Sequence, residues 1–485
     1  MSQTVPFPPL PFDAAMLIGA EWRRADATLP LTDPSTGLET AAIARASARD
    51  VDAAVDAARA AANGAWGQTT AVDRGRLLAR LGALVLDHVD ALARIEAHDV
   101  GKPITQARAD AVALARYCEF YAGAADKLHG ETIPFQNGYT VYTLREPHGV
   151  TGHIVPWNYP MQIIGRSVGA ALAAGNACVL KPAEDACLTA LYFAHLAQEA
   201  GLPAGALNVV PGLGAEAGAA LAAHPGIDHL SFTGSVATGV AVQTAAARNV
   251  VPVTLELGGK SPQLVFADAD LDAALPYLVR AGLQNAGQTC SAASRILIER
   301  SIFDTVAARM AAAYTGLRIG PAADDPDIGP VINARQKARV LGYLDQAGDL
   351  PLIARADPDP VLAAQGHFVP ACLFGPVGPD HPLAQEEVFG PVQVLIPFDT
   401  EDEAVAIANG TPYGLVAAVW SESGARQMRL ARALRAGQVF LNDYGAGGGV
   451  ELPFGGTGHS GHGREKGFEA LMGFTRLKTV AARHG

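Results

Sequence analysis

The chain has 485 residues, of which 49% are hydrophobic and 17% are charged, and its formal net charge is −12. A chain of this length exceeds the ~250–300 residues at which a single core stops growing, so we expect about three domain-sized units. Nucleic-acid-binding proteins need a concentrated basic face. The acidic balance and the lack of a basic cluster argue against that class.

Cysteine usage and the absence of apolar runs bear on the compartment. The first residues lack a basic segment followed by an apolar core, and no apolar run reaches the ~18 residues of a membrane span. We therefore expect a cytoplasmic protein with no membrane partner. We also expect no metal site, because His459 and His462 are interpreted as loop residues. The cysteines are scattered and never form a C-x-x-C pair, as is typical of reduced thiols: Cys118, Cys178, Cys187, Cys290 and Cys372.

The N-terminal segment, to about residue 126, is predicted to be mostly helical. Apolar residues recur at helical spacing in 41–62 and 74–100, and Gly101-Lys-Pro follows as a stop signal. Residues 139–145 are typical of a strand, and their position suggests an outlying arm used between subunits. The tail, 473–480, is also predicted to be a strand and to pair with this arm.

From residue 149 to 259, short apolar runs alternate with helical patterns. This alternation predicts a doubly wound parallel sheet, in which ligands bind at the carboxyl ends of the strands. The predicted strands are 150–155, 177–180, 207–210, 229–232 and 253–257, and the predicted helices are 161–174, 187–200, 214–223 and 235–247.

A second α/β unit is predicted from residue 260 to about 458. The glycine run 445–449 is interpreted as a loop. The predicted strands of this unit are 264–266, 296–298, 392–396, 416–420 and 438–441, with helices between them.

Cys290 lies in a stretch of small polar residues, Gln-Asn-Ala-Gly-Gln-Thr-Cys-Ser-Ala-Ala-Ser, from 284 to 294. Leu271, Leu275 and Leu278 precede it at helical spacing, and Gly287 is predicted to end that helix. The thiol is therefore expected in a turn, open to a small electrophile. An isolated cysteine is more often an inert small hydrophobe, so this stretch alone does not decide its role.

Polar residues follow each predicted strand of the first sheet. Asn158 lies between two prolines, where its amide could stabilise an oxyanion or form a local turn. Lys181 and Glu184 suit a ribose, or simply a solvated helix start. Glu256 ends the last strand, as a general base or a capping carboxylate. The turn 234–239 opens a helix whose free N–H groups suit a phosphate, although many such turns have no ligand.

Taken together, these segments resemble the NAD(P)-dependent aldehyde dehydrogenase superfamily, of the hydrolytic type that does not acylate coenzyme A. The likeness extends from about residue 18 to 480. The segments, in chain order, are Pro156-Trp-Asn-Tyr-Pro, Lys181-Pro-Ala-Glu, Phe232-Thr-Gly-Ser, Leu255-Glu-Leu-Gly-Gly-Lys, Gly287-Gln-Thr-Cys, Glu387-Val-Phe-Gly-Pro and Pro453-Phe-Gly-Gly.

The resemblance implies an aldehyde dehydrogenase-like α/β fold with three parts. These are a Rossmann-type NAD-binding domain (1–127 and 147–258), an α/β catalytic domain (259–458), and a small β oligomerisation arm with the tail (128–146 and 459–485). A homodimer or homotetramer is expected.

The resemblance also implies the chemistry. Cys290 would attack the aldehyde, Asn158 and the Cys290 N–H would hold the oxyanion, and Glu256 would activate water to hydrolyse a thioester. NAD is expected as the cofactor, with NADP less favoured. The implied cofactor contacts are Val155, Pro156, Trp157, Lys181, Glu184, Gly214, Phe232, Gly234, Ser235, Gly239, Leu257, Gly258, Glu387 and Phe389. Glu465 matches a carboxylate near the water path of the family.

The substrate pocket is implied to include Tyr159, Arg166, Gln284 and Phe454. Semialdehyde dehydrogenases carry an arginine at the position of Arg166 to hold a distal carboxylate, but a second arginine expected before the nucleophile is Gln284 here. A protein carboxylate could equally be the partner of Arg166. The sequence also leaves open a coenzyme A-acylating relative, an inert structural relative, and a thiol hydrolase, which would need a histidine paired with Cys290.

Overall fold

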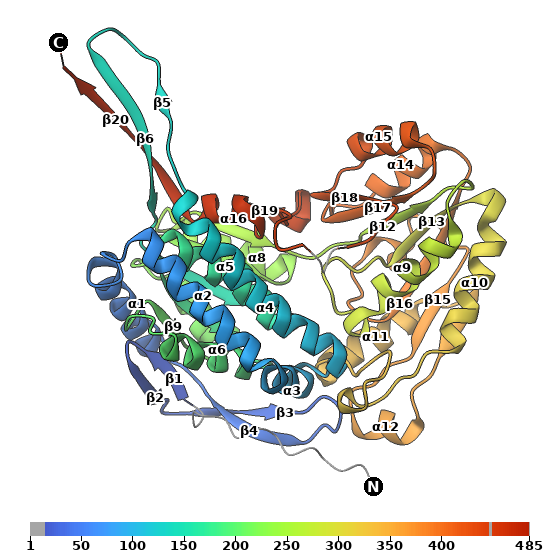
Figure 1. The fold of residues 1–485 in the computed structure, drawn as a ribbon. Helices are drawn as coiled ribbons and strands as arrows, with labels where there is room; N and C mark the ends of the chain where they lie inside the picture. The colour runs from blue at the N-terminus through green and yellow to red at the C-terminus, as the bar shows by residue number, and fades with distance from the viewer. Residues whose placement is uncertain (1–14, 446–448, 485) are drawn as a thin grey trace.

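The computed structural model describes residues 15–445 and 449–484. It has two α/β lobes, each built on one large sheet, and a narrow arm of three strands that projects from the first lobe (Figure 1). The interpretations of residues 1–14 and of 446–448, within the glycine run, lie outside the described residues. Within them, no helix is long and apolar enough to cross a membrane.

The first sheet confirms the predicted parallel core. Its strand order is β19-β11-β10-β7-β8-β9-β1-β2, and the five predicted strands pair in parallel. Because helices cover both faces, these strands are buried along nearly their whole length. The strands are β7 (Val150–Val155), β8 (Ala177–Pro182), β9 (Leu207–Val209), β10 (His229–Thr233) and β11 (Val253–Glu256), and the helices are α5 (Pro160–Ala174), α6 (Leu188–Glu199), α7 (Ala219–Ala222) and α8 (Val236–Ala247).

The N-terminal segment differs from the prediction. The helix predicted over 41–62 begins only at Ala48, because Ser47 caps it by accepting from the Asp50 N–H, and residues 41–44 belong to a strand. The stretch 74–100 is two helices that meet at His88. The elements are β1 (Ala15–Ile18), β2 (Glu21–Arg24), β3 (Thr28–Thr32), β4 (Glu39–Ala44), α1 (Ala48–Asn63), α2 (Ala71–Asp87), α3 (Val89–Val100) and α4 (Ile104–Ala124).

The second sheet has the order β14-β15-β16-β13-β12-β17-β18, and it contains all five predicted strands. Two strands were not predicted, β14 at the edge of the sheet and β15 beside it. The strands are β12 (Pro262–Val265), β13 (Arg295–Glu299), β14 (Leu352–Ala356), β15 (Ala371–Phe374), β16 (Val392–Phe398), β17 (Val416–Trp420) and β18 (Gln438–Leu441). The helices are α9 (Leu271–Leu283), α10 (Phe303–Thr315), α11 (Ala334–Gln346), α12 (Pro360–Gln365), α13 (Pro382–Gln385), α14 (Glu401–Asn409) and α15 (Gly424–Ala433).

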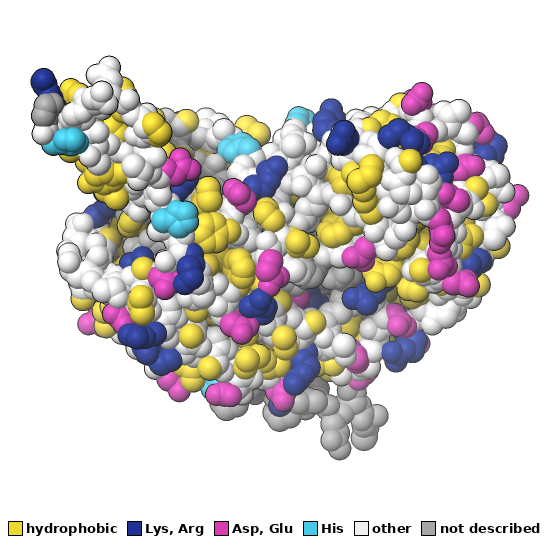
Figure 2. Space-filling model, turned by 45° about the horizontal axis from the view of Figure 1, so that its top comes forward, with side chains coloured by type: hydrophobic (Ala, Val, Ile, Leu, Met, Phe, Trp, Pro, Cys, Tyr) yellow, Lys and Arg dark blue, Asp and Glu magenta, His cyan; other side chains and the backbone are white. Residues whose placement is uncertain are grey.

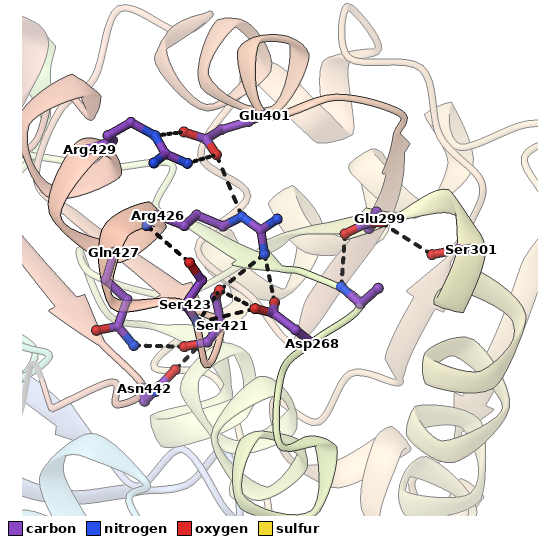
Figure 3. A network of polar contacts seen from close by, with 11 residues as sticks. Asp268, Glu299, Ser301, Glu401, Ser421, Ser423, Arg426, Gln427, Arg429 and Asn442 are labelled. Carbon is purple, nitrogen blue, oxygen red and sulfur yellow. Dashed lines mark hydrogen bonds and ion pairs between the residues drawn. The ribbon is translucent and has the colours of Figure 1, made fainter.

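A polar network ties the outer helices of the second lobe to its strands (Figure 3). Arg426 of α15 contacts Asp268 at 2.7 Å and Glu401 of α14 at 3.5 Å. Its guanidinium also lies 4.4 Å from the Phe266 ring centroid. The Ser421 N–H donates to the Asn442 side chain at 3.0 Å, which fixes the chain just beyond β18. That segment leads directly into the large cavity described below.

The arm is a three-stranded antiparallel sheet, β20-β6-β5. The predicted pairing of arm and tail is confirmed, because β20 (Thr475–Arg483) pairs with β6 (Tyr139–Pro147) along its full length. The third strand is β5 (Thr132–Ile133). Before the arm, the tail passes over the first lobe, where β19 (Gly461–His462) pairs with β11 and α16 (Gly467–Gly473) packs on α5.

A buried ion cluster joins α3 and α4 to the wall of the cavity. Lys102 is 0% exposed, and its ammonium pairs with Glu96 at 2.8 Å and with Asp110. The same ammonium lies 4.0 Å from the Tyr159 ring centroid. Burial raises the pKa of Glu96 to about 8, although the charge of Lys102 opposes the rise.

Lys102→Met should lower the free energy of unfolding by about 3–5 kcal/mol, because it leaves a buried carboxylate without its cation. Urea denaturation at pH 7 measures the change, with exposed Lys127→Met as the matched control. A loss below about 1 kcal/mol, the value of a surface ion pair, would contradict a structural role for this cluster.

Candidate active site

A cavity of about 1570 Å³ lies between the two lobes and collects nearly all of the predicted site residues. Because the carboxyl ends of parallel strands meet at one edge of a sheet, residues far apart in sequence converge there. The predicted residues that line it are Val155, Pro156, Trp157, Asn158, Tyr159, Arg166, Lys181, Glu184, Gly214, Phe232, Gly234, Ser235, Glu256, Leu257, Gly258, Gln284, Cys290, Glu387, Phe389 and Phe454.

Two predicted residues do not line the cavity. Gly239 lies one turn into α8, where an added Cβ would approach the Leu257 side chain to 2.6 Å. The glycine therefore allows α8 to pack closely on Leu257, which does line the cavity. Glu465 is fully buried behind the wall. Its carboxylate accepts from the Ser231 hydroxyl at 2.7 Å.

Cys290 is held in a turn, as predicted. Helix α9 ends at Leu283, and the next residues reverse the chain with positive φ values of 52° at Asn285 and 73° at Gly287. A Cβ at Gly287 would lie 2.1 Å from the Gly390 carbonyl oxygen, so the reversal needs glycine. Cys290 is the one cysteine of the five that is not buried.

The surroundings of Cys290 keep its thiol protonated. Burial raises its pKa to about 11, while the nearby Arg166 lowers it and the carboxylates of Glu387 and Glu256 raise it. The helix dipole gives no help, because the sulfur follows the carboxyl end of α9. A thiolate therefore needs a base or a further positive charge in the cavity.

Asn158 is fixed by hydrogen bonds to the turn that carries Cys290. Its side-chain amide nitrogen donates to the Gln288 backbone carbonyl at 3.1 Å. Its backbone carbonyl accepts from the Asn285 side-chain amide at 3.0 Å. An amide nitrogen has two donors, so one N–H remains after this contact. The arrangement places a fixed donor beside Cys290.

Glu256 is 1% exposed, and neither of its carboxylate oxygens has a hydrogen-bond partner among the described residues. Burial, followed by the charge of Glu465, raises its pKa well above the ordinary value, while Arg166 opposes the rise. A carboxyl group whose pKa is raised in this way is a stronger base once it has lost its proton.

Arg166 points from α5 to the same region. Its Nε pairs with a carboxylate oxygen of Glu465, so the structure shows the protein partner that the sequence left open. Its guanidinium also lies 5.0 Å from the Phe454 ring centroid. One guanidinium nitrogen, Nη2, is buried with no hydrogen-bond partner among residues 15–445 and 449–484.

The far end of the cavity carries a cation, a carboxylate and a helix start. Lys181 pairs with Glu184 at 2.8 Å, and Glu184 also accepts from the Gly214 N–H at 3.4 Å. Although burial opposes ionisation, the charge of Lys181 keeps the pKa of Glu184 below its ordinary value. Ser235 caps α8 by accepting from the Thr238 N–H at 3.3 Å. This end can hold a hydroxylated, phosphorylated group.

The second lobe supplies one wall between the two ends. Glu387 accepts from the Gly259 N–H at 3.0 Å, and burial raises its pKa to about 7. Phe389 has a positive φ of 59° and contacts Trp157 edge-to-face, with ring centroids 5.5 Å apart. A Cβ at Gly258 would lie 2.4 Å from the Glu387 carboxylate, so the absence of a side chain at Gly258 allows this close approach.

Sequence reasoning missed several residues of the cavity. Lys466 lines it and is 3% exposed, and the Tyr444 hydroxyl donates to the Ser291 carbonyl. Neither residue belongs to the segments that resemble the family, although Lys466 directly follows Glu465. None of the described residues that line the cavity is a histidine. No group of three or more His, Cys, Asp or Glu among the described residues is placed to hold a metal ion.

Solved structures of other proteins are similar to this chain in both sequence and fold. A crystal structure of a Burkholderia cenocepacia protein is 65% identical and superposes with a TM-score of 0.96, covering 97% of this chain and 100% of that one. The NAD⁺ complex of the Bacillus cereus aldehyde dehydrogenase is 38% identical with a TM-score of 0.95, covering 98% of this chain and 97% of that one.

Curated sequences agree. The hydroxyisobutyraldehyde dehydrogenase of Mycolicibacterium austroafricanum is 40% identical over 472 residues, covering 96% of this chain and 93% of that protein. Residues 22–480 match the aldehyde dehydrogenase family. The chain therefore belongs to the aldehyde dehydrogenase family, with the α/β fold expected from its sequence.

Proposed function

We propose that this protein oxidises an aldehyde to the carboxylic acid with NAD, using Cys290 as the nucleophile, Asn158 as an oxyanion donor and Glu256 as the base. The observation that carries the proposal is the meeting of the accessible Cys290, the fixed Asn158 amide and the orphaned Glu256 carboxylate in one cavity. The absence of histidine from the described lining disfavours a Cys-His hydrolase.

Addition to the aldehyde begins with the thiol. Its proton passes to Glu256, directly or through water, and the sulfur attacks the carbonyl carbon to give a thiohemiacetal. The free N–H of the Asn158 amide and the Cys290 backbone N–H stabilise the oxyanion, and pre-organised donors of this kind lower a barrier by about 2.7–4 kcal/mol. When the oxyanion collapses, the carbon loses a hydride and a thioester remains on Cys290.

Hydrolysis completes the cycle. Glu256 first releases to solvent the proton that it took from the thiol. It then takes a proton from water as the oxygen attacks the thioester carbon, and the carbon–sulfur bond breaks to release the acid, while the proton held by Glu256 returns to the sulfur. Glu256 suits both steps because its raised pKa makes it a stronger base once its proton has been lost. Glu465 supports this by raising that pKa through its own charge.

The residues of the cavity fit NAD. The Lys181–Glu184 pair suits the hydroxyls of a ribose, and the start of α8 at Ser235 offers free N–H groups to a pyrophosphate. Glu387 and Phe389 suit the second ribose and the nicotinamide. NAD supplies the hydride acceptor and, next to Cys290, a positive ring. The bound NAD⁺ in the Bacillus cereus relative supports the assignment.

The domains follow the two sheets, with the NAD-binding domain at 1–127 and 147–258, the catalytic domain at 259–458 and the arm at 128–146. The pairing of β19 with β11 supports moving 459–474 from the arm to the first domain. The five unpaired cysteines support a cytoplasmic location.

The arm supports a homodimer or a homotetramer. Figure 2 shows hydrophobic side chains gathered on it, and β5 and β20 are its two edge strands. Such edges and apolar side chains are the usual means by which subunits associate. The exposed members are Ile133, Phe135, Tyr142, Leu144 and Leu477.

The substrate is an aldehyde with a distal carboxylate, held by Arg166. The buried Nη2 without a partner among the described residues supports this, because a guanidinium can grip a carboxylate while its Nε remains on Glu465. Gln284, whose amide donates to the Tyr159 hydroxyl at 2.8 Å, gives that wall a neutral polar surface.

Cys290→Ala should abolish aldehyde oxidation and leave NAD affinity unchanged, because the thiol reacts and does not hold the cofactor. Glu256→Gln should lower steady-state turnover roughly 100- to 10,000-fold, the usual contribution of a general base, because the same carboxylate serves both the addition and the hydrolysis steps. Absorbance at the NADH band measures both. Cys372→Ala, at a buried thiol on β15, is the control. Full steady-state turnover in either site variant would remove that residue from the mechanism.

NAD should be preferred over NADP by at least about tenfold in kcat/KM, because the Glu184 carboxylate would meet a 2′-phosphate at a cost on the order of 1–4 kcal/mol. Glu184→Gln should lower the ratio of kcat/KM for NAD to kcat/KM for NADP, mainly by raising kcat/KM for NADP. Equal kcat/KM for both cofactors in the unmodified enzyme would refute this role of Glu184.

Arg166→Leu should raise KM for succinic semialdehyde by about 10- to 100-fold, the worth of a charged hydrogen bond. The neutral comparison is 4-methylpentanal, in which an isopropyl group replaces the carboxylate, and its Michaelis constant should change by less than about threefold. Because the substitution also leaves Glu465 buried without its cation, Arg166→Lys is assayed alongside. Equal effects on both aldehydes would show that Arg166 serves the protein and not the substrate.

A further inference from the structure

Lys466 is a buried cation in the wall of the catalytic cavity. It is 3% exposed, and its backbone holds a positive φ of 61°, a conformation that residues with a side chain rarely adopt. Its ammonium lies 5.3 Å from the centroid of the Phe454 ring. Arg166 approaches the same ring to 5.0 Å. Two cations from different elements thus meet one aromatic side chain next to Cys290.

The antiparallel bridge between Phe454 and Glu465 explains the geometry. The Phe454 N–H donates to the Glu465 carbonyl at 2.6 Å, and the Phe454 carbonyl accepts from the Glu465 N–H at 2.7 Å. The bridge holds the segment against the wall of the cavity. Glu465 contacts Ser231 and Arg166, and the next residue, Lys466, lines the cavity.

The charges around this ring favour an anion. Two cationic side chains, Arg166 and Lys466, lie against this ring, and the carboxylate of Glu465 pairs with Arg166. Burial, followed by the charge of Glu465, raises the pKa of Glu256, which disfavours its charged form. Asp110 and Asp443 also line the cavity, but Asp110 is paired with Lys102 and Asp443 accepts from the Tyr444 N–H at 2.7 Å.

We propose that Lys466 is a specificity-determining residue: together with Arg166 it holds the distal carboxylate of the substrate aldehyde against the Phe454 ring. This inference rests on the proposed function. A lysine from the C-terminal segment then takes the place of the second arginine that is absent at Gln284. The substrate class is a short aldehyde with a carboxylate at its far end.

The charge of Lys466 depends on pH in the range where the enzyme can be assayed. Burial, followed by the charge of Arg166, lowers the pKa of Lys466 to about 8, while Cys290, Glu256 and Glu465 act in the opposite direction. Lys466 is therefore charged below that pH and loses its charge above it. The preference for a semialdehyde over a matched neutral aldehyde should fall as pH rises from 7 to 9.

The test compares Lys466→Met and Lys466→Arg with the unmodified full-length enzyme. The substrates are succinic semialdehyde and 4-methylpentanal, each at pH 7 and pH 9 with saturating NAD. Lys466→Met should lower kcat/KM for succinic semialdehyde about 10- to 100-fold, leave the neutral aldehyde within about threefold, and abolish the pH dependence of the ratio. Lys466→Arg should keep the preference at both pH values, since arginine does not lose its charge. Exposed Lys127→Met is the control for lysine removal.

A second readout does not depend on turnover of the semialdehyde. Succinate should inhibit oxidation of 4-methylpentanal competitively, and Lys466→Met should raise its inhibition constant by the same factor. An equal loss of kcat/KM with both aldehydes, or an unchanged inhibition constant, would overturn the assignment. If the unmodified enzyme oxidises 4-methylpentanal but shows no preference for succinic semialdehyde, the carboxylate-bearing substrate class is overturned. If it oxidises no aldehyde at all, the proposed function itself is refuted.

Discussion

The buried contact between Arg166 and Glu465 is the constraint on which the catalytic side of the cavity depends. Arg166 belongs to α5 of the first lobe, and Glu465 lies in a segment 299 residues later that bridges to Phe454. Ser231 on β10 holds the other oxygen of the same carboxylate. Breaking the pair would leave a charge buried without a partner, so the helix, the strand and the C-terminal segment must close together.

The same pair sets the protonation of the reacting groups. Glu465 raises the pKa of Glu256, and Arg166 lowers that of Cys290 against the effect of burial. The protein thus brings a thiol and a carboxyl group, both with raised pKa values, together in one cavity. The charges of Arg166 and Glu465, which do not react, lie near Cys290 and Glu256, which must gain and lose protons. Burial makes these electrostatic interactions stronger than they would be in water.

A second buried cluster supports the opposite wall. Lys102 pairs with Glu96 and Asp110 and lies against the Tyr159 ring, which follows Asn158 directly. Asp110 also accepts from the Gln162 side chain on α5 at 2.5 Å. The oxyanion donor is therefore held from the first lobe by a charge network and from the second lobe by the turn of Cys290. Rigid support from both sides is what a pre-organised donor requires.

The sequence determined the parallel sheets, the pairing of arm and tail and the turn at Cys290, which depend on local signals: short apolar runs, glycines where the chain reverses, and polar residues just past strand ends. The full set of residues that meet in the cavity followed from the resemblance of the motifs to the family. It misplaced the start of α1 and merged α2 with α3, because alanine-rich segments carry helical spacing on either side of a capping residue. The outer strands β14 and β15, of which β14 forms the edge, lacked a distinct pattern.

Only the tertiary structure decided which charges meet. The sequence could not show that Arg166 pairs with Glu465, or that Arg166 reaches the same Phe454 ring as Lys466, since Arg166 lies about 300 residues before these partners. Glu256 and Glu184 are the same residue type at similar strand ends, yet the pKa of one is raised and that of the other is lowered. The physical reason is that a charge is governed by its burial and its partners in space, and neither is written in the residues next to it in the chain.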